Sequence, residues 1–220
     1  MIIYERVQVW DVPVRLVHWF LVVLIAFSWW SGSEGGNMMT YHMWSGYSIL
    51  TLLLFRIAWG FIGSGPARFT AFVRGPRTVC RYLGTMRDRQ PSGHPGHNPL
   101  GGWSVVLMLA SIALQAGTGL FANDDIMTEG PLYGWVSKST SDLLTSIHHF
   151  NFKLLLTLVA LHLAAIFFHL TYKSENLVGA MFTGIKRVAA PVEKAPMAGT
   201  ARAVAIFLAA AAAVYLLVTT

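Results

Sequence analysis

Five long apolar stretches constrain the fold of this 220-residue chain more than any other feature. A helix needs about 20 largely apolar residues to cross the hydrocarbon core of a bilayer. With 55% apolar and only 12% charged residues, the chain is too apolar for a soluble domain. We therefore expect an all-α integral membrane protein. Its five spans would be Leu16–Trp30 with its flanks, Tyr41–Ile62, Gly101–Phe121, Leu143–Tyr172 and Ala203–Thr220.

The first stretch has an alternative interpretation as a secretory signal, because Arg6 and Arg15 precede it. It lacks an A-x-A cleavage site and contains a histidine, so we interpret it as a span. Between the first two spans, Ser31–Thr40 is short and rich in glycine, which predicts a tight loop.

Basic residues are concentrated on one side of the predicted spans, although the net charge of +6 alone would also suit a nucleic-acid-binding protein. Lys and Arg accumulate in cytoplasmic loops, so the N-terminus is predicted to be cytoplasmic in a bacterial inner membrane, and no nucleic acid is needed. One side carries Arg68, Arg74, Arg77, Arg81, Arg87, Arg89, Lys173, Lys186, Arg187, Lys194 and Arg202; the other carries Lys138 with Asp124, Asp125, Glu129 and Asp142.

The cysteine count limits the metal chemistry that is open to the chain. Cys80 is the single cysteine, which excludes an internal disulfide, a thiolate zinc site, an iron–sulfur cluster and C-x-x-C-H haem attachment. A bound metal would therefore need histidine ligands.

Histidines inside a membrane are costly and so indicate function. His148 and His162 are 14 residues apart on one span, which returns to within about 40° of the same helix face with a rise of about 21 Å. His149 lies about 140° from the face of His162, so we expect it to point elsewhere. His169 is nearly on that face but about 10 Å deeper, which makes it a weaker candidate.

Depth in the membrane pairs the remaining histidines. His42 opens the second span near the level of His148, and His18 lies near the level of His162. Single histidines of this kind are usually packed polar residues or proton relays. Two imidazole pairs on facing helices, about 20 Å apart, instead favour two haems with bis-histidine iron ligation.

Other side chains lie where they would support such a site. Arg56 follows His42 by 14 residues and would pair with a haem propionate, or else snorkel at a helix end. Lys153 is a similar candidate beside His148. The glycines that would let a porphyrin lie close to backbone are Gly46, Gly117 and Gly119. The loop histidines, His94 and His97, are expected to be solvated and without a role.

Several short motifs together resemble the prokaryotic cytochrome b561 family, which is related to the cytochrome b subunits of nickel–iron hydrogenases. The resemblance covers roughly Val9 to Lys186. It rests on Val17-His18-Trp19, on Tyr41-His42 with Gly46 and Arg56, on Asn98-Pro99-Leu100-Gly101-Gly102, on Ile147-His148 and Leu161-His162, and on the stretch from Lys173 to Gly184.

This resemblance implies a four-helix membrane bundle that binds two haems b, with His18, His42, His148 and His162 as the iron ligands. The core would occupy residues 1–190, and residues 191–220 would add a linker and a fifth C-terminal transmembrane helix. The implied function is electron transfer between membrane quinone and an extracytoplasmic redox partner, such as a c-type cytochrome that docks near Ala122–Asp142. Alternatives are a superoxide oxidase or other quinone reductase, favoured by a basic pocket containing Lys153, and a haem-free histidine-lined transporter.

Overall fold

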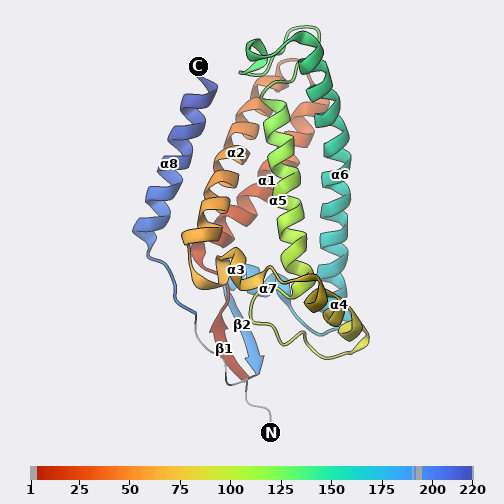
Figure 1. Ribbon diagram of the computed structural model, residues 1–220, viewed down its shortest axis with the longest axis vertical. Helices are drawn as coiled ribbons and strands as arrows, with labels where there is room; N and C mark the ends of the chain where they lie inside the picture. Colours follow the sequence, from red (N-terminus) through yellow and green to blue (C-terminus); the bar gives the residue numbers. More distant parts are fainter. Residues whose placement is uncertain (1–3, 190, 192–194, 220) are drawn as a thin grey trace. The chain divides into compact units, whose positions relative to one another are not determined.

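The computed structural model describes residues 4–189, 191 and 195–219, so Lys194 and Thr220 lie outside the described part of the chain. Five of its helices are long and apolar enough to cross a membrane, and they coincide with the five predicted spans (Figure 1). The prediction of an all-α, multi-pass membrane protein is confirmed. These helices are α1 Val12–Glu34, α2 Met38–Ile62, α5 Pro99–Gly119, α6 Lys138–Thr171 and α8 Thr200–Val218.

Local sequence signals explain where two of the long helices begin. The Asp11 carboxylate accepts the backbone N–H of Val14 at 2.8 Å and so caps the first turn of α1. Its second oxygen accepts the indole N–H of Trp59 at 2.8 Å. In the same way, the Asn98 side chain accepts the backbone N–H of Gly101 at 2.7 Å where α5 begins. Each capping residue precedes a proline in the first turn, where a missing N–H costs nothing.

Short elements connect the long helices. Between α2 and α5 lie η1 Gly65–Ala67, α3 Phe69–Phe72, α4 Pro76–Gly84 and η2 Thr85–Arg87; between α5 and α6 lies η3 Tyr133–Trp135; and α6 is followed by α7 Leu177–Thr183 and β2 Ile185–Ala189.

A two-stranded antiparallel sheet joins the start of the chain to the segment after α6. Strand β1, Tyr4–Gln8, pairs with β2 so that Tyr4 lies opposite Ala189 and Gln8 opposite Ile185. Gly184 precedes β2 with φ +78°, and its carbonyl accepts the N–H of Val9 at 2.8 Å. The sequence analysis did not predict these strands.

The chain divides into two compact units. The first comprises Met1–Leu16, Ala58–Leu107 and Leu158–Ala203, and the second comprises Val17–Ile57, Met108–Thr157 and Val204–Thr220. Helices α1, α2, α5, α6 and α8 contribute residues to both units. The units thus cut across helices, and the division of the chain at residue 190 stays a prediction.

A buried polar cluster in the first unit is centred on Glu175, which is 4% exposed. Its carboxylate accepts hydrogen bonds from His169 Nδ1 at 2.8 Å and Ser92 Oγ at 2.8 Å, and pairs with Lys186 Nζ at 2.5 Å. Burial raises the pKa of Glu175, but the bonds from His169, Lys186 and Ser92 outweigh it and lower the pKa to about 2. Asn98 Nδ2 donates to His169 Nε2 at 3.3 Å, so both ring nitrogens of His169 are engaged within the protein.

The two loop histidines also lie in the first unit, and the expectation that they are solvated was wrong. His97 is half-buried, and its ring centroid lies 4.5 Å from that of Trp10 and 4.7 Å from that of Phe72. His94 lies 5.8 Å from Tyr82. Proline and glycine in this segment marked a loop, but they gave no sign that it folds onto aromatic side chains.

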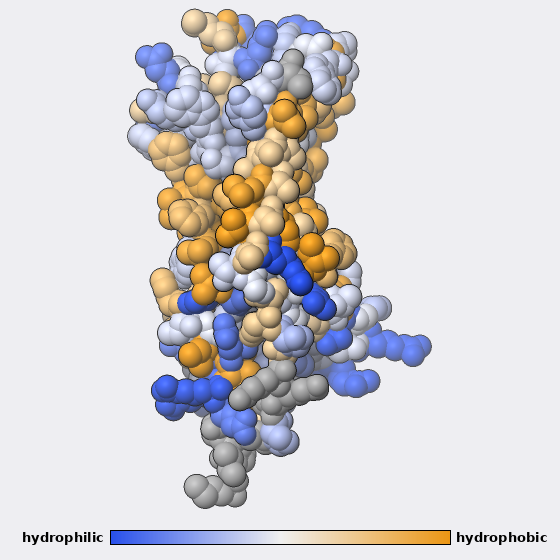
Figure 2. All heavy atoms as spheres, turned by 90° about the vertical axis from the view of Figure 1, so that its left-hand side faces the viewer, coloured by the Kyte–Doolittle hydropathy of each residue, from blue (hydrophilic) through white to orange (hydrophobic). Residues whose placement is uncertain are grey.

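In the second unit, α8 packs against α2 through Phe207 and Phe55, whose ring centroids are 6.3 Å apart. One face of α8 presents apolar side chains outward (Figure 2), whereas Ala210 and Val214 are buried. The exposed large ones are Val204, Phe207, Leu208, Tyr215 and Leu216. An exposed surface of this kind suits lipid rather than water.

The Glu175 cluster leads to a pH-dependent prediction. Because the folded pKa of Glu175 lies below its usual value of 4.5, the carboxylate stabilises the fold above about pH 4.5, and this stabilisation is lost as the pH falls towards 2. We expect Glu175→Gln to cost about 3 kcal/mol near pH 7, since it leaves the half-buried Lys186 without its counterion. Thermal unfolding in detergent measures this loss.

The same scans at pH 3 and pH 5 test the sign. The melting temperature of the wild type should fall further than that of Glu175→Gln over this range. Exposed Glu34→Gln serves as the control and should behave like the wild type. Equal acid sensitivity of wild type and Glu175→Gln would contradict the assignment.

Candidate functional site

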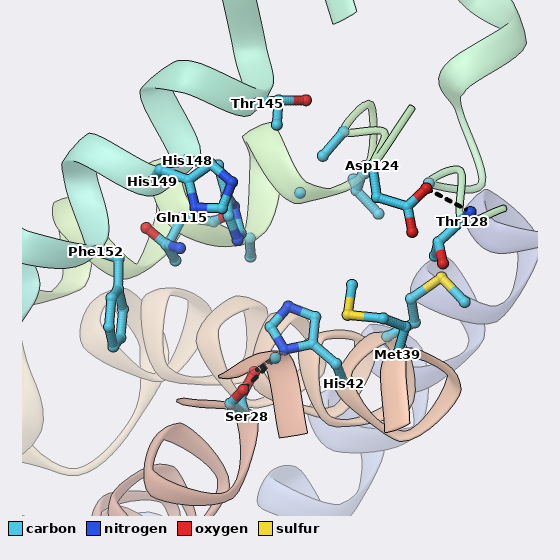
Figure 3. A pocket seen from close by; sticks show the side chains of 18 of the residues that line it. Ser28, Met39, His42, Gln115, Asp124, Thr128, Thr145, His148, His149 and Phe152 are labelled. Atoms are coloured by element: carbon cyan, nitrogen blue, oxygen red, sulfur yellow. Dashed lines mark hydrogen bonds between the residues drawn. The ribbon is translucent and has the colours of Figure 1, made fainter. Parts of the chain in front are cut away.

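A cavity of about 520 Å³ lies within the second unit, where residues of α1, α2, α5 and α6 line it (Figure 3). His42 of α2 and His148 of α6 reach into it from opposite sides. Their ring centroids are 6.2 Å apart, and the ring planes are inclined by 77°. The structure thus brings together the two histidines that depth in the membrane had paired. We refer to this space as the His42–His148 cavity.

Each imidazole is held through Nδ1 by a backbone carbonyl of a neighbouring helix. His42 Nδ1 donates to the carbonyl oxygen of Ser28 in α1 at 2.8 Å (Figure 3), and His148 Nδ1 donates to that of Gln115 in α5 at 2.9 Å. Because a carbonyl oxygen only accepts, Nδ1 carries the proton and Nε2 keeps its lone pair. Histidines that bind metals are oriented in this way, with the second nitrogen donating to a backbone carbonyl or carboxylate.

A glycine lies one helical turn after each accepting carbonyl, on the same helix face: Gly32 follows Ser28, and Gly119 follows Gln115. A Cβ atom at Gly32 would lie 2.8 Å from Nδ1 of the facing histidine, and one at Gly119 would lie 3.0 Å from Cε1. The two glycines therefore leave room for the imidazoles. Gly119, which we expected to accommodate a porphyrin, lines the cavity and lies beside the His148 imidazole.

The distance between the rings fits a metal ion held between them. When two imidazoles bind one metal from opposite sides, with each nitrogen about 2 Å from the metal, the ring centroids lie roughly 6 Å apart. Among the described residues, no group of three or more His, Cys, Asp or Glu side chains is placed to hold a metal ion. A metal bound by two imidazoles then needs its other ligands from a cofactor, and a haem porphyrin supplies them.

The walls of the cavity also suit a porphyrin. They are mainly apolar, with Ile25, Ile49, Ile112, Phe152 and Leu155 among the lining residues. Gly46 lines the cavity, and no atom lies within 4 Å of a Cβ built at this position. His42, His148 and the space around them would therefore fit a haem held between the two imidazoles.

Comparison with known proteins agrees with this geometry. The family model described as prokaryotic cytochrome b561 matches residues 9–184. The chain belongs to this family. A relative, the probable Ni/Fe-hydrogenase B-type cytochrome subunit of Rhizobium leguminosarum bv. viciae, is 26% identical over 215 residues, which cover 82% of this chain and 88% of the relative. No solved structure matches the chain. As a member of this family, the chain is a b-type membrane cytochrome, for which haem b is the implied cofactor.

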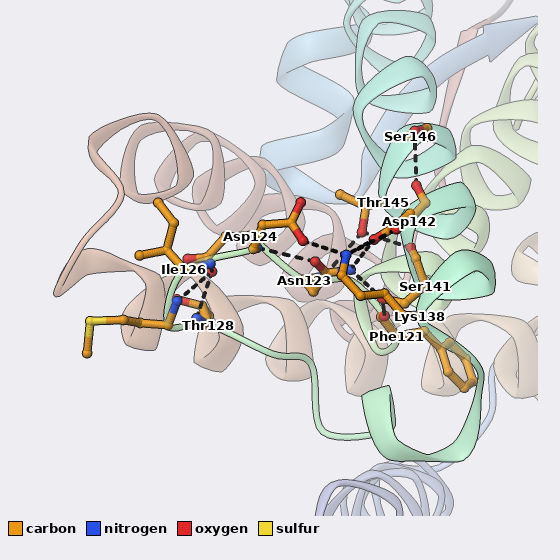
Figure 4. Close-up of polar contacts among 12 residues, drawn as sticks. Phe121, Asn123, Asp124, Ile126, Thr128, Lys138, Ser141, Asp142, Thr145 and Ser146 are labelled. Atoms are coloured by element: carbon orange, nitrogen blue, oxygen red, sulfur yellow. Dashed lines mark hydrogen bonds and ion pairs between the residues drawn. The ribbon is translucent and has the colours of Figure 1, made fainter.

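The segment after α5 completes one wall of the cavity and is fixed by side-chain hydrogen bonds (Figure 4). Asn123 Nδ2 donates to Ser141 Oγ at 2.6 Å. The Asp124 carboxylate accepts the backbone N–H groups of residues 126–128 at 2.8–2.9 Å. These bonds, that of Thr128 first, lower the pKa of Asp124. This wall is thus a structured turn that carries a negative charge.

Some predicted residues lie elsewhere than expected. His149 is exposed but lines the cavity beside His148, so the expectation that it points elsewhere was wrong. The angle of about 140° describes the position of His149 on α6 relative to His162. The cavity extends around a wider part of α6 than the face that carries His148 and His162. Lys153 is exposed and does not line the cavity, because five residues turn a helix by about 140°. Gly117 does not line it either.

The two members of the second predicted histidine pair belong to different units. His18 is half-buried in α1, with its ring centroid 4.9 Å from that of Trp19, and His162 is half-buried in α6. Their pairing stays a prediction. Arg56 is only 5% exposed, which disagrees with a side chain that snorkels to a helix end.

The sequence analysis missed Ser28 and Gly32. It assigned Ser31–Thr40 to a loop, whereas α1 continues to Glu34 and α2 begins at Met38. The glycine content of this stretch suggested a loop, but Gly32 lies inside a helix at the point where an imidazole approaches. A signal was present in the four-residue spacing of Ser28 and Gly32, which places both on one helix face.

We expect Gly32→Ala to weaken haem binding at the His42–His148 cavity by 10-fold or more, because the added methyl group displaces the His42 imidazole from the Ser28 carbonyl. The haem-to-protein ratio of the purified variant measures this loss. The helix itself gains up to about 1 kcal/mol from the substitution, so poor folding would not explain a lower ratio.

The matched control is Gly117→Ala, the same change in another long helix at a glycine with no atom within 4 Å of its Cβ. It should retain the wild-type ratio. Full haem content in Gly32→Ala would show that the imidazole does not need this space.

Proposed function

We propose that this chain is a transmembrane electron-transfer cytochrome that holds two haems b, each between two histidines. One haem would bind between His42 and His148, and the other between His18 and His162. The observation that carries the proposal is the geometry of the first pair: rings 6.2 Å apart, each Nδ1 bonded to a carbonyl, and each Nε2 left with a lone pair.

The site for the second haem rests on the position of its residues along the helices. His148 and His162 lie on one continuous helix, α6, 14 residues apart, which corresponds to a rise of about 21 Å. Arg56 lies 14 residues after His42 on α2 and is buried, and we propose that its guanidinium lies near a propionate of the second haem and neutralises its charge.

Electron transfer follows from the ligand set. When bound, haem supplies one-electron chemistry, and two axial imidazoles leave no open position for a substrate on the metal. The backbone carbonyls of Ser28 and Gln115 would hold the two imidazoles in position. We propose that electrons pass between membrane quinone and an extracytoplasmic redox protein, such as a c-type cytochrome, that docks near Ala122–Asp142. Asp124, Asp125, Glu129 and Asp142 give this segment the negative charge that attracts a basic partner.

The two alternative functions receive less support. A superoxide oxidase would benefit from a basic pocket, but the His42–His148 cavity has no Lys or Arg among its described lining residues, and Lys153 is outside it. A haem-free transporter disagrees with membership of a cytochrome b family. The relative's name describes a hydrogenase subunit. At 26% identity, this relative supports a common cytochrome core but does not identify the redox partner of this chain. We infer the kind of partner from the surface of this chain instead.

The distribution of charge supports an orientation in the bacterial inner membrane. Arg68, Arg74, Arg77 and Arg81 follow α2, and Lys173 follows α6. Short loops that are rich in Lys and Arg remain in the cytoplasm. We therefore propose a cytoplasmic N-terminus, with the His42–His148 cavity near the opposite face of the membrane.

Alanine substitution of the four histidines tests the proposal. We expect about two haems per wild-type chain by pyridine haemochrome, with b-type absorbance on reduction by dithionite. His42→Ala and His148→Ala should each remove one and the same haem, and His18→Ala and His162→Ala the other, because a single axial ligand holds haem weakly. Reduced-minus-oxidised spectra at low temperature distinguish the two.

His149→Ala is the control, since it changes the residue next to a ligand and should leave both haems in place. A colourless wild-type protein from haem-replete cells would reject the proposed function. Loss of haem in His149→Ala, with full retention in His148→Ala, would reassign the ligand.

A further inference from the structure

A buried network of amide and hydroxyl groups lies beside the residue that holds His148. At its centre is Asn151 on α6, which is 1% exposed. Asn151 Nδ2 donates to the backbone carbonyl of Ser111 at 2.9 Å and to Gln115 Oε1 at 2.7 Å, and Ser111 Oγ donates to Asn151 Oδ1 at 3.1 Å. Every polar group of the Asn151 side chain is thus used in bonds to α5.

Gln115 connects this network to the metal ligand. Its side-chain oxygen accepts the bond from Asn151, while its backbone carbonyl accepts the bond from His148 Nδ1 at 2.9 Å. Gln115 also lines the His42–His148 cavity. The residue that orients the imidazole is therefore itself anchored by a buried amide on the same helix as that imidazole.

We propose that Asn151 is a positioning residue for His148: it fixes Gln115 and thereby sets the strength of the bond between His148 Nδ1 and the Gln115 carbonyl. This inference rests on the proposed function, in which His148 is an axial ligand of haem. A stronger bond at Nδ1 makes Nε2 a more basic donor to iron and favours the ferric state. The network thus lowers the reduction potential of one haem and leaves the other unaffected.

Helix packing alone does not account for this arrangement. A buried amide costs free energy unless its bonds are made, and an apolar residue of similar size would join α5 and α6 without that cost. The neighbouring buried positions Ile112 and Leu155 are apolar. The one buried amide on α6 in the described part of the second unit is bonded to the residue that accepts the hydrogen bond of His148.

The test is a spectroelectrochemical titration of Asn151→Leu in the full-length protein with both haems bound. Without the bond from Asn151 to Gln115, the preference of one haem for the ferric state should weaken about tenfold. This raises the midpoint potential of that haem by about 59 mV for one electron. The potential of the second haem should not move. The low-temperature spectra of the histidine variants identify which haem has shifted.

The control is Thr157→Val, which removes another side-chain hydrogen bond of α6, that from Thr157 Oγ1 to the Lys153 carbonyl, at a position that does not line the cavity. It should leave both potentials where they are in the wild type. Equal shifts in both variants would mean that general loosening of α6 is responsible, and would overturn the inference. An unchanged potential in Asn151→Leu would do the same.

Gln115→Leu provides a second route to the same answer if Asn151→Leu folds poorly. It keeps the backbone carbonyl but removes the acceptor for Asn151, so it should shift the same potential in the same direction. Because both changes break one pathway, the double variant should show no further shift. Additive shifts would contradict a pathway through Gln115.

The outcome separates this inference from the proposed function. If the wild type lacks a haem bound by His148, the proposed function fails before any potential is measured. If that haem is present and its potential is the same in wild type, Asn151→Leu and Gln115→Leu, only the role of Asn151 is rejected.

Discussion

The hydrogen bond between an imidazole Nδ1 and a backbone carbonyl of the next helix is the interaction on which the His42–His148 cavity depends. In a membrane-spanning region, a polar ring without a partner would cost several kcal/mol. The bond removes that cost, and it also decides which ring nitrogen is free. With Nδ1 committed, Nε2 is the nitrogen that faces the cavity. The bond that satisfies the ring would therefore also prepare the imidazole to bind the iron of the proposed haem.

The same device appears twice, in two pairs of helices. His42 of α2 bonds to Ser28 of α1, and His148 of α6 bonds to Gln115 of α5. In both pairs, a glycine one turn further along removes the side chain that would block the ring. The two imidazole rings approach the cavity from opposite sides, and the same hydrogen bond with its neighbouring glycine positions each of them. The repeated contact is a hydrogen bond from a side chain to a backbone carbonyl. Because every residue has a backbone carbonyl, the amino-acid sequence gives little sign of which residue accepts this bond.

Hydropathy and helix geometry explain why much of this was predictable. Apolar length located all five spans to within a few residues, because a bilayer imposes a minimum length on any helix that crosses it. Position along a span gives depth, and depth paired His42 with His148. Neither argument needs knowledge of how the helices pack.

The remainder depended on packing, which the sequence does not reveal. The angle of a residue on its own helix says nothing about how widely a cavity extends around that helix, so His149 was misplaced. Strands of five residues carry little signal, and β1 and β2 are about 180 residues apart in the chain. Asn151 looked like an ordinary polar residue in a span until its bonds to α5 were visible.

The pairing of β1 with β2 has a consequence for how the chain is made. Residues 4–8 leave the ribosome well before residues 185–189, which contain the backbone groups that they bond to. The N-terminal segment must therefore wait, without its ladder partners, while α1, α2, α5 and α6 are synthesised. Once β2 emerges, the sheet joins the two ends of this four-helix segment before α8, which follows in the chain, is inserted. The order of synthesis thus separates closure of the cytochrome core from addition of α8.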